Sequence, residues 1–402
     1  MANDTPNIAK ILIVDDDPFM LKVVTRVLAT LGFEQVLCCE SGRQALVLLA
    51  EETPAVDLIL CDLNMPEMDG VEFIRHLAER RYPSALILMS GEDVRILQTA
   101  DKLARSHQLT VLGHLQKPVN PEKLKRLIDL GVTRSDAKPS PTRSVVNVEE
   151  LRQAIFGGEL VNFYQPQVVV ATGQVIGVES LVRWRHPRDG WVGPDRFIRV
   201  AERHGLIDDL THCVVNQAVA QVGAWRDLGL TLKMAINISM DNLSRLNFPE
   251  FMEAQAAAAK VNPADIVLEV TESRLMKDPL KSLDILARLR LKRFSLSIDD
   301  FGTGYSTLSQ LRDIPFDELK IDRGFVHGAS RDNFIRVIFA ASQHMAEQLG
   351  MRIVAEGVED QEDWNYIANS HCHLAQGYFI AKPMPANELP DWMQTWNAGW
   401  SG

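Results

Sequence analysis

The chain has 402 residues, of which 46% are hydrophobic and 24% are charged, and its formal net charge is −11. This composition is typical of an ordinary soluble globular protein, and the length predicts two or three domains. The acidic balance argues against general nucleic-acid binding, so no DNA binding is expected, although a metal ion or a local arginine could still hold a nucleotide.

The number and spacing of the cysteines and the hydropathy of the chain predict where in the cell the protein resides. The five cysteines are an odd number and show no C-x-x-C or Cys/His pattern with zinc spacing, which indicates reduced thiols. The chain contains no apolar run of the roughly 18 residues that a spanning helix needs, and its N-terminus lacks the pattern of a signal peptide. The sequence therefore predicts a cytoplasmic protein without a membrane span.

Residues 1–130 alternate short apolar strands with amphipathic helices, which predicts a doubly wound parallel sheet. Four strands are expected, over residues 11–14, 56–61, 86–89 and 111–115. A polar residue follows each of them: Asp15 with Asp16, then Asp62, Ser90 and Lys117. In such sheets the functional residues collect beyond the carboxyl ends of the strands, so these side chains are expected to converge.

These polar side chains suit phosphoryl chemistry. Asp15, Asp16 and Asp62 could hold one Mg²⁺ through oxygen ligands. Asp62 could accept a phosphoryl group whose oxygens the Ser90 hydroxyl and the Lys117 ammonium would bind. A single aspartate after a strand is more often a turn residue, and the whole set in this order is what favours a site.

Residues 8–130 resemble a response-regulator receiver domain. The most specific motif is Asp62-Leu-Asn-Met-Pro-Glu-Met-Asp-Gly, with support from Val14-Asp-Asp, Ser90-Gly and Lys117-Pro. The resemblance implies that a partner histidine kinase phosphorylates Asp62 and that a cis proline follows Lys117. His114 stands where the family usually has an aromatic switch residue, so receiver output could be coupled differently or weakly. A receiver that acts only in dimerisation or docking stays open.

Residues 131–145 are polar and contain two prolines without apolar periodicity, which indicates a semi-rigid linker. The remainder, residues 146–402, has the usual size of a (β/α)₈ barrel, roughly 250 residues. Strands are expected over residues 162–168, 175–184, 232–238, 266–271, 294–299, 318–321, 352–355 and 374–379. Helices are expected over residues 196–204, 208–228, 249–260, 281–291 and 333–349. The predicted fold is thus a doubly wound receiver followed by a TIM-like barrel.

Seven of the expected barrel strands carry a polar residue near one end. Strand parity places these residues opposite the apolar side chains that pack on the outer helices, so they should point into the barrel lumen. They are Glu179, Asn237, Glu269, Asp299 with Asp300, Lys320, Glu356 and Gln376. The sequence therefore predicts a polar cluster at the mouth where barrel enzymes perform their chemistry.

Carboxylate and amide oxygens, without cysteine or a nearby histidine pair, favour Mg²⁺ or Mn²⁺ over zinc. There are too many acids for one ion. Glu179, Asn237, Glu269 and Asp299 could hold one cation, and Asp299 as a bridge with Asp300 and Glu356 could hold a second. Such a pair would activate a water for phosphoester hydrolysis and stabilise the leaving oxygen. Alternatively, some of these acids pair with barrel arginines.

This region resembles the EAL family of cyclic-di-GMP phosphodiesterases over essentially its whole length. The signature is Glu179-Ser-Leu-Val-Arg183, in which Ser180 replaces the usual alanine. The supporting motifs are Tyr164-Gln-Pro, Ile236-Asn-Ile-Ser, Glu269-Val-Thr-Glu, Asp299-Asp-Phe-Gly-Thr-Gly, Leu319-Lys-Ile-Asp, Ala355-Glu-Gly-Val-Glu and Gln376-Gly-Tyr.

The resemblance implies hydrolysis of cyclic di-GMP to linear pGpG with two Mg²⁺ or Mn²⁺ ions. It assigns metal ligation to Glu179, Asn237, Glu269, Asp299, Asp300 and Glu356, and catalytic roles to Glu356, Lys320 and Gln376. It further assigns substrate contacts to Gln165 and Arg183 and loop support to Glu272 and Glu359. A dimer or higher homo-oligomer is the family expectation. The alternative is a degenerate barrel that binds cyclic di-GMP and signals through protein contacts, which missing ligands would favour.

Overall fold

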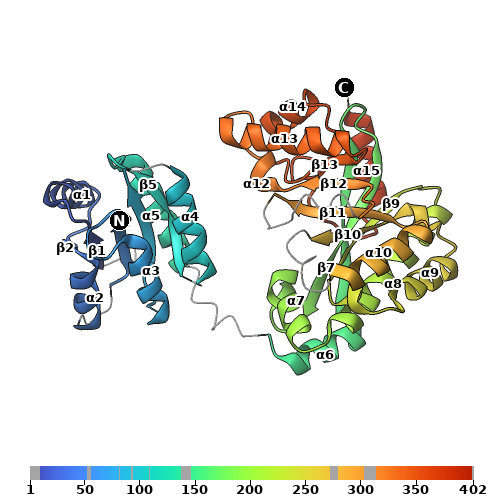
Figure 1. The fold of residues 1–402 in the computed structure, drawn as a ribbon, viewed down its shortest axis with the longest axis horizontal. Coiled ribbons are helices and arrows are strands. Elements are labelled where there is room, and N and C mark those ends of the chain that lie inside the picture. Colours follow the sequence, from blue (N-terminus) through green and yellow to red (C-terminus); the bar gives the residue numbers. More distant parts are fainter. Residues whose placement is uncertain are drawn as a thin grey trace, which may run out of the picture. The chain divides into compact units, whose positions relative to one another are not determined.

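The computed structural model describes residues 10–51, 56–80, 82–91, 94–107, 109–136, 146–271, 279–302 and 314–400. The chain divides into two compact units, Met1–Ser144 and Val145–Gly402. The first unit is blue to teal in Figure 1 and the second is green to red.

The N-terminal unit is built on a five-stranded parallel sheet with the order β2-β1-β3-β4-β5. The strands are β1 Lys10–Val14, β2 Gln35–Cys39, β3 Leu58–Asp62, β4 Ala85–Ser90 and β5 Thr110–Gln116. The helices are α1 Pro18–Thr30, α2 Gly42–Glu51, α3 Gly70–Glu79, α4 Val94–Ser106 and α5 Pro121–Asp136. This architecture confirms the doubly wound fold.

Alternate residues of the central strands are buried on opposite faces of this sheet. Ile11 and Ile13 pack with side chains of α1 and α5, whereas Leu12 and Val14 pack with side chains of α2, α3 and α4. Strand β2 was not predicted; it is an edge strand in which only Cys39 is buried. Helix α5 ends at Asp136, so the expected linker, residues 131–145, begins inside this helix, and residues 137–145 lie outside the described part.

The second unit is a closed eight-stranded barrel with the order β6-β14-β13-β12-β11-β10-β9-β7, in which β6 also pairs with β7. The strands are β6 Leu160–Val169, β7 Val175–His186, β9 Lys233–Ile238, β10 Ile266–Thr271, β11 Ser295–Phe301, β12 Glu318–Ile321, β13 Arg352–Ala355 and β14 Leu374–Ala375. A short strand, β8 Gly190–Val192, pairs with the end of β7. The TIM-like barrel is confirmed, and three of its strands have the predicted bounds.

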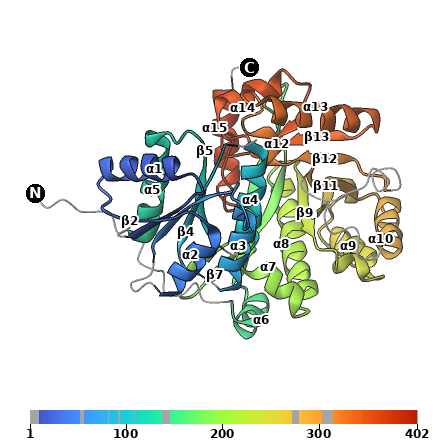
Figure 2. The ribbon, with the colours of Figure 1, turned by 60° about the vertical axis from the view of Figure 1, so that its left-hand side comes forward.

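Helices cover the outside of the barrel; Figure 2 shows α8 beside β9 and α10 beside β11. The helices are α6 Val148–Gly157, α7 Pro194–Arg203, α8 Ile207–Asp227, α9 Phe248–Ala258, α10 Pro279–Leu291, α12 Arg323–Val326, α13 Asn333–Gln348, α14 Gln361–Ala368 and α15 Leu389–Gly399, with short 3₁₀ turns at Asn242–Ser244 and Pro263–Asp265. Asp332 caps α13 by accepting hydrogen bonds from the backbone N–H groups of Phe334 and Ile335.

Two features of the barrel differ from the expectation. Strand β6 runs antiparallel to both of its neighbours, because a short turn rather than a crossover helix joins it to β7. Strand β14 stops at Ala375 instead of residue 379. Beyond it Gly377 lies so close to Val358 that a side chain at this position would overlap the Val358 backbone. Gln376, between β14 and this close approach, donates from Nε2 to Glu179 Oε2.

Candidate active site

The N-terminal unit brings its predicted polar residues together beyond the strand ends. Lys117 Nζ lies 2.7 Å from Asp15 Oδ2 and 3.0 Å from Asp62 Oδ2. Carboxylate oxygens of Asp15, Asp16 and Asp62 lie within 4.8 Å of one another. Asp15 and Asp62 are buried, whereas Asp16 is exposed. The donor set of three carboxylates beside one ammonium suits a divalent cation and a phosphoryl group.

The surroundings of this cluster fit the same chemistry. Burial raises the pKa of Asp62, although Lys117 opposes that shift. Ser90 ends β4 fully buried, and its carbonyl accepts the Lys117 N–H at 2.8 Å. The Lys117–Pro118 peptide bond is cis, as expected. His114 is half-buried on β5, where burial lowers its pKa.

In the barrel, Lys320 stands at the centre of the acidic cluster with its side chain 1% exposed. Its Nζ lies 2.6 Å from Glu356 Oε1 and 2.8 Å from Glu269 Oε1, and 3.4 Å from both Glu179 Oε2 and Asp299 Oδ1. Five strands thus direct side chains at one point, as the parity argument predicts.

Amide side chains hold Glu179 in place. Gln376 Nε2 donates to Glu179 Oε2 at 2.5 Å and to Gln165 Oε1 at 3.1 Å, and Asn237 Nδ2 donates to Glu179 Oε1 at 2.7 Å. Gln167, which the sequence analysis missed, donates to Gln376 Oε1 at 2.9 Å. Its signal was parity, because it lies two residues from Gln165 on β6 and therefore on the same face.

A second group of acids, which includes Asp299 and Asp300, lies where the strand pairing of the barrel is irregular. The pairing of β11 with β12 shifts between Ile298 and Phe301, and Asp300 has a left-handed φ of 55°. This irregularity turns two consecutive carboxylates toward the same site, where Asp299, Asp300 and Glu356 offer oxygens within 4.8 Å of one another. Burial, with repulsion from Asp299 and Asp322, raises the pKa of Asp300 to about 6.

The electrostatics of the cluster indicate excess negative charge. Burial and the neighbouring Glu179 raise the pKa of Glu269 well above its ordinary value, and burial does the same for Glu356. Burial alone would lower the pKa of Lys320, but the surrounding carboxylates raise it well above its usual range. Glu269 Oε2 is buried and accepts no hydrogen bond from any described residue. One ammonium does not satisfy these acids, so the donor set fits additional cations.

The remaining predicted residues lie in different places. Gln165 is buried beside Glu179, and its Nε2 donates to the Ala381 carbonyl. Arg183 is half-buried on the same face of β7, and its Nη1 donates to the Val182 carbonyl. Glu359 pairs with Arg323 at 2.7 Å. Glu272 lies outside the described residues.

A cavity of about 400 Å³ opens beside Glu179 and Asn237 and extends between the barrel and the helices α7 and α8. Ser180, the departure from the signature, is 3% exposed and lines this cavity rather than the acidic cluster. A serine in place of the usual alanine therefore adds a hydroxyl beside Glu179 on the cavity side and leaves the acidic cluster unchanged.

Family models match both units: the EAL domain over residues 148–383 and the response regulator receiver domain over residues 11–129. This chain belongs to the EAL family. It joins the EAL domain to an N-terminal receiver domain. In the part of the chain that the structure describes, no helix is long and apolar enough to cross a bilayer.

Relatives share one or both domains. The cyclic di-GMP phosphodiesterase RocR of Pseudomonas aeruginosa is 31% identical over 392 residues, which cover 96% of this chain and 99% of RocR. The cyclic di-GMP phosphodiesterase NbdA of the same organism is 38% identical over 256 residues, but these span only 33% of NbdA and 63% of this chain.

Solved structures resemble the EAL domain in fold. The PaMucR phosphodiesterase in complex with c-di-GMP has a TM-score of 0.58 and 37% identity over 60% of this chain and 98% of that one. The EAL domain of Mycobacterium smegmatis DcpA has a TM-score of 0.51 and 30% identity over 59% of this chain and 98% of that one.

Proposed function

We propose that this protein is a response regulator that hydrolyses cyclic di-GMP to linear pGpG with two divalent metal ions, and that phosphorylation of Asp62 controls the reaction. The EAL domain and the full-length similarity to the phosphodiesterase RocR support the enzyme class. The observation that carries the proposal is the convergence of the acidic side chains on Lys320 at the barrel mouth.

The proposed metal ligands form two sets. Glu179, Asn237, Glu269 and Asp299 would hold one Mg²⁺ or Mn²⁺ ion, and Asp299 would bridge to a second ion held by Asp300 and Glu356. The buried Glu269 Oε2, which accepts no hydrogen bond from the described residues, and the raised pKa of Asp300 support this assignment. Two ions at these ligands would supply the positive charge that a phosphodiester and its attacking water need.

The chain's other residues then have specific tasks. Lys320 Nζ lies 2.6 Å from Glu356 Oε1, and Lys320 would orient the attacking water beside this carboxylate. Gln376 fixes Glu179 in the orientation for ligation. Gln165 and Arg183 would contact the substrate, because both lie on the face that carries Glu179. Loop support remains the proposed role of Glu272 and Glu359.

In the receiver domain, Asp62 is the proposed phosphoacceptor for a partner histidine kinase. Asp15, Asp16 and Asp62 would hold one Mg²⁺, and Lys117 and Ser90 would bind the phosphoryl oxygens. The proposal includes a dimer or higher homo-oligomer and, because the cysteines are free thiols, a cytoplasmic location.

The first test is hydrolysis of cyclic di-GMP by the purified full-length protein with Mg²⁺ or Mn²⁺, followed by chromatography. We expect pGpG as the product and at least about a 100-fold lower rate for Glu179→Ala, because the variant lacks a proposed ligand. If the wild type formed no more pGpG than the variant, the enzyme proposal would fail. Binding without turnover would instead support the degenerate-barrel alternative, which the complete ligand set disfavours.

The second test addresses Asp62. We expect a small phosphodonor to change the hydrolysis rate of the wild type and to leave Asp62→Ala unchanged, because the variant has no phosphoacceptor. Phosphoryl incorporation measured in parallel would show that the donor reacts at Asp62. Equal rates that do not respond to the donor in both proteins would contradict phosphorylation control and favour a receiver that acts only in docking.

A further inference from the structure

The short helix α12 follows the strand of Lys320 and touches the segments after Asp300 and Glu356. A Cβ atom on Gly302, two residues after Asp300, would come within 2.8 Å of Phe325 Cε2. A Cβ atom on Gly357, the residue after Glu356, would overlap the Arg323 side chain. A shift of α12 would therefore move two of the proposed metal ligands.

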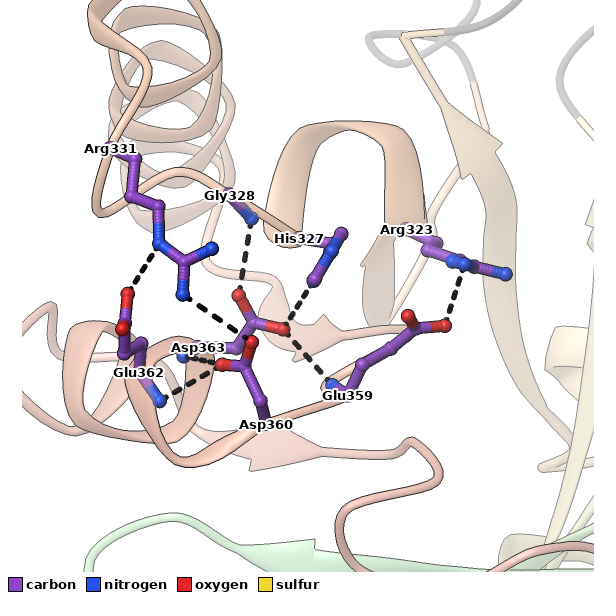
Figure 3. A network of polar contacts seen from close by, with 8 residues as sticks. All are labelled: Arg323, His327, Gly328, Arg331, Glu359, Asp360, Glu362 and Asp363. Carbon is purple, nitrogen blue, oxygen red and sulfur yellow. Dashed lines mark hydrogen bonds and ion pairs between the residues drawn. The ribbon is translucent and has the colours of Figure 1, made fainter. Parts of the chain in front are cut away.

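A single buried carboxylate anchors the end of α12. Asp363 is 1% exposed in the first turn of α14. Its Oδ2 accepts from His327 Nδ1 at 2.8 Å and from the Glu359 N–H at 3.0 Å, and its Oδ1 accepts from the Gly328 N–H at 3.1 Å (Figure 3). His327 and Gly328 directly follow α12, and Glu359 belongs to the loop that carries Glu356. Asp363 thus joins the two segments.

The surroundings hold this carboxylate in its charged form. Burial raises the pKa of Asp363, but the hydrogen bonds from His327, Glu359 and Gly328 outweigh burial and lower it. Asp360, the cap of α14, accepts the Asp363 N–H at 2.9 Å and so fixes the backbone that presents the carboxylate. The side chain therefore has a defined position and a full charge.

The two arginine–glutamate ion pairs of this network are more exposed than Asp363. Arg323 pairs with Glu359, and Arg331 pairs with Glu362 at 2.5 Å, with side chains 60% and 56% exposed in the second pair (Figure 3). Exposed ion pairs hold a geometry weakly. The buried Asp363 is therefore the anchor, and the Arg331–Glu362 pair provides a matched control.

We propose that Asp363 is a positioning residue that holds α12 against the β13–α14 loop and so fixes Asp300 and Glu356 at the distance needed to share one divalent ion. The inference rests on the proposed ligand roles of these two residues. His327, Asp360 and Asp363 also have ligand atoms within 4.8 Å of one another. However, both Asp363 oxygens already accept hydrogen bonds, so the structure favours an anchor over a separate metal site.

The test is direct Mn²⁺ titration of the full-length protein, with free Mn²⁺ followed by electron paramagnetic resonance. Every protein compared, including the one called wild type here, carries Asp62→Ala, which removes a proposed receiver ligand so that the titration reports the barrel. Asp363→Asn should weaken Mn²⁺ binding by about 10-fold, because its NH₂ group cannot accept from the N–H groups that the carboxylate serves. Excess Mn²⁺ should restore the hydrolysis rate, and the KM for cyclic di-GMP should change less than about twofold. Glu362→Gln should bind Mn²⁺ like the wild type.

His327 gives a second pair of variants if Asp363→Asn folds poorly. The Asn side-chain nitrogen can replace imidazole Nδ1 as a donor, so His327→Asn should keep Mn²⁺ affinity while His327→Leu weakens it. Unchanged affinity in both Asp363→Asn and His327→Leu would overturn the proposal, as would a wild type that binds no Mn²⁺ in the barrel. A wild type that binds Mn²⁺ but does not hydrolyse cyclic di-GMP would refute only the proposed function, because the binding comparison stands by itself.

Discussion

Lys320→Met is expected to destabilise the metal-free protein by about 3–5 kcal/mol, because removal of one partner from a buried ion pair leaves uncompensated charge. Lys320 is the one cation paired with Glu179, Glu269, Asp299 and Glu356 among the residues that the structure describes. The loss should appear in urea unfolding with EDTA at pH 8. Saturating Mn²⁺ should restore part of it, since bound cations would neutralise the same carboxylates.

The Mn²⁺-dependent gain in stability should therefore be larger in Lys320→Met than in the wild type, although hydrolysis falls by about 10²–10⁴ when a proton-transfer group is lost. Lys292→Met is the matched control. Lys292 pairs with Glu253, whose side chain is 55% exposed, and this substitution should cost about 0–1 kcal/mol. A Lys320→Met protein as stable as the wild type in EDTA would contradict the view that Lys320 compensates buried carboxylates.

The bounds of the barrel strands were predictable where a strand coincides with a short buried run of residues. The strands β10, β12 and β13 are short buried runs, and their predicted bounds were correct. Strand β2 was missed although residues 36–39 form a short apolar run, and as an edge strand it buries only Cys39. The antiparallel direction of β6 was missed although the sequence contained a signal, since the gap of residues 169–174 before β7 is too short for the crossover that parallel neighbours need.

The site was predictable as a set of residues but not as a geometry. Parity assigned Lys320 and Glu269 to the lumen, yet only barrel closure brings Gln376 to Glu179 across 197 positions of sequence. The left-handed Asp300 and the shifted pairing beside it have no signature in composition or period. The contact between Asp363 and His327 joins the first turn of α14 to the end of α12, and a periodic pattern does not encode such a contact.

Glu269→Gln is expected to have opposite effects on activity and stability. Hydrolysis should fall at least about 100-fold, because loss of a group that merely supports a metal ligand already costs about 10–100-fold. In EDTA the variant should be more stable than the wild type at pH 8, since burial and Glu179 disfavour the charged form of Glu269. The raised pKa means that the Glu269 contribution to stability is present at low pH and lost as pH rises through the folded-state pKa.

The stability gain of Glu269→Gln should therefore grow from pH 5 to pH 8, which thermal unfolding in EDTA would measure. Glu318→Gln is the control, for which we expect a change in stability of the opposite sign. Glu318 is equally buried on β12 but pairs with Arg352 at 2.5 Å, so this variant should lose stability and keep its metal dependence. A Glu269→Gln protein that is less stable than the wild type at pH 8 would show that Lys320 fully compensates Glu269. The excess negative charge on which the proposed metal site depends would then be absent.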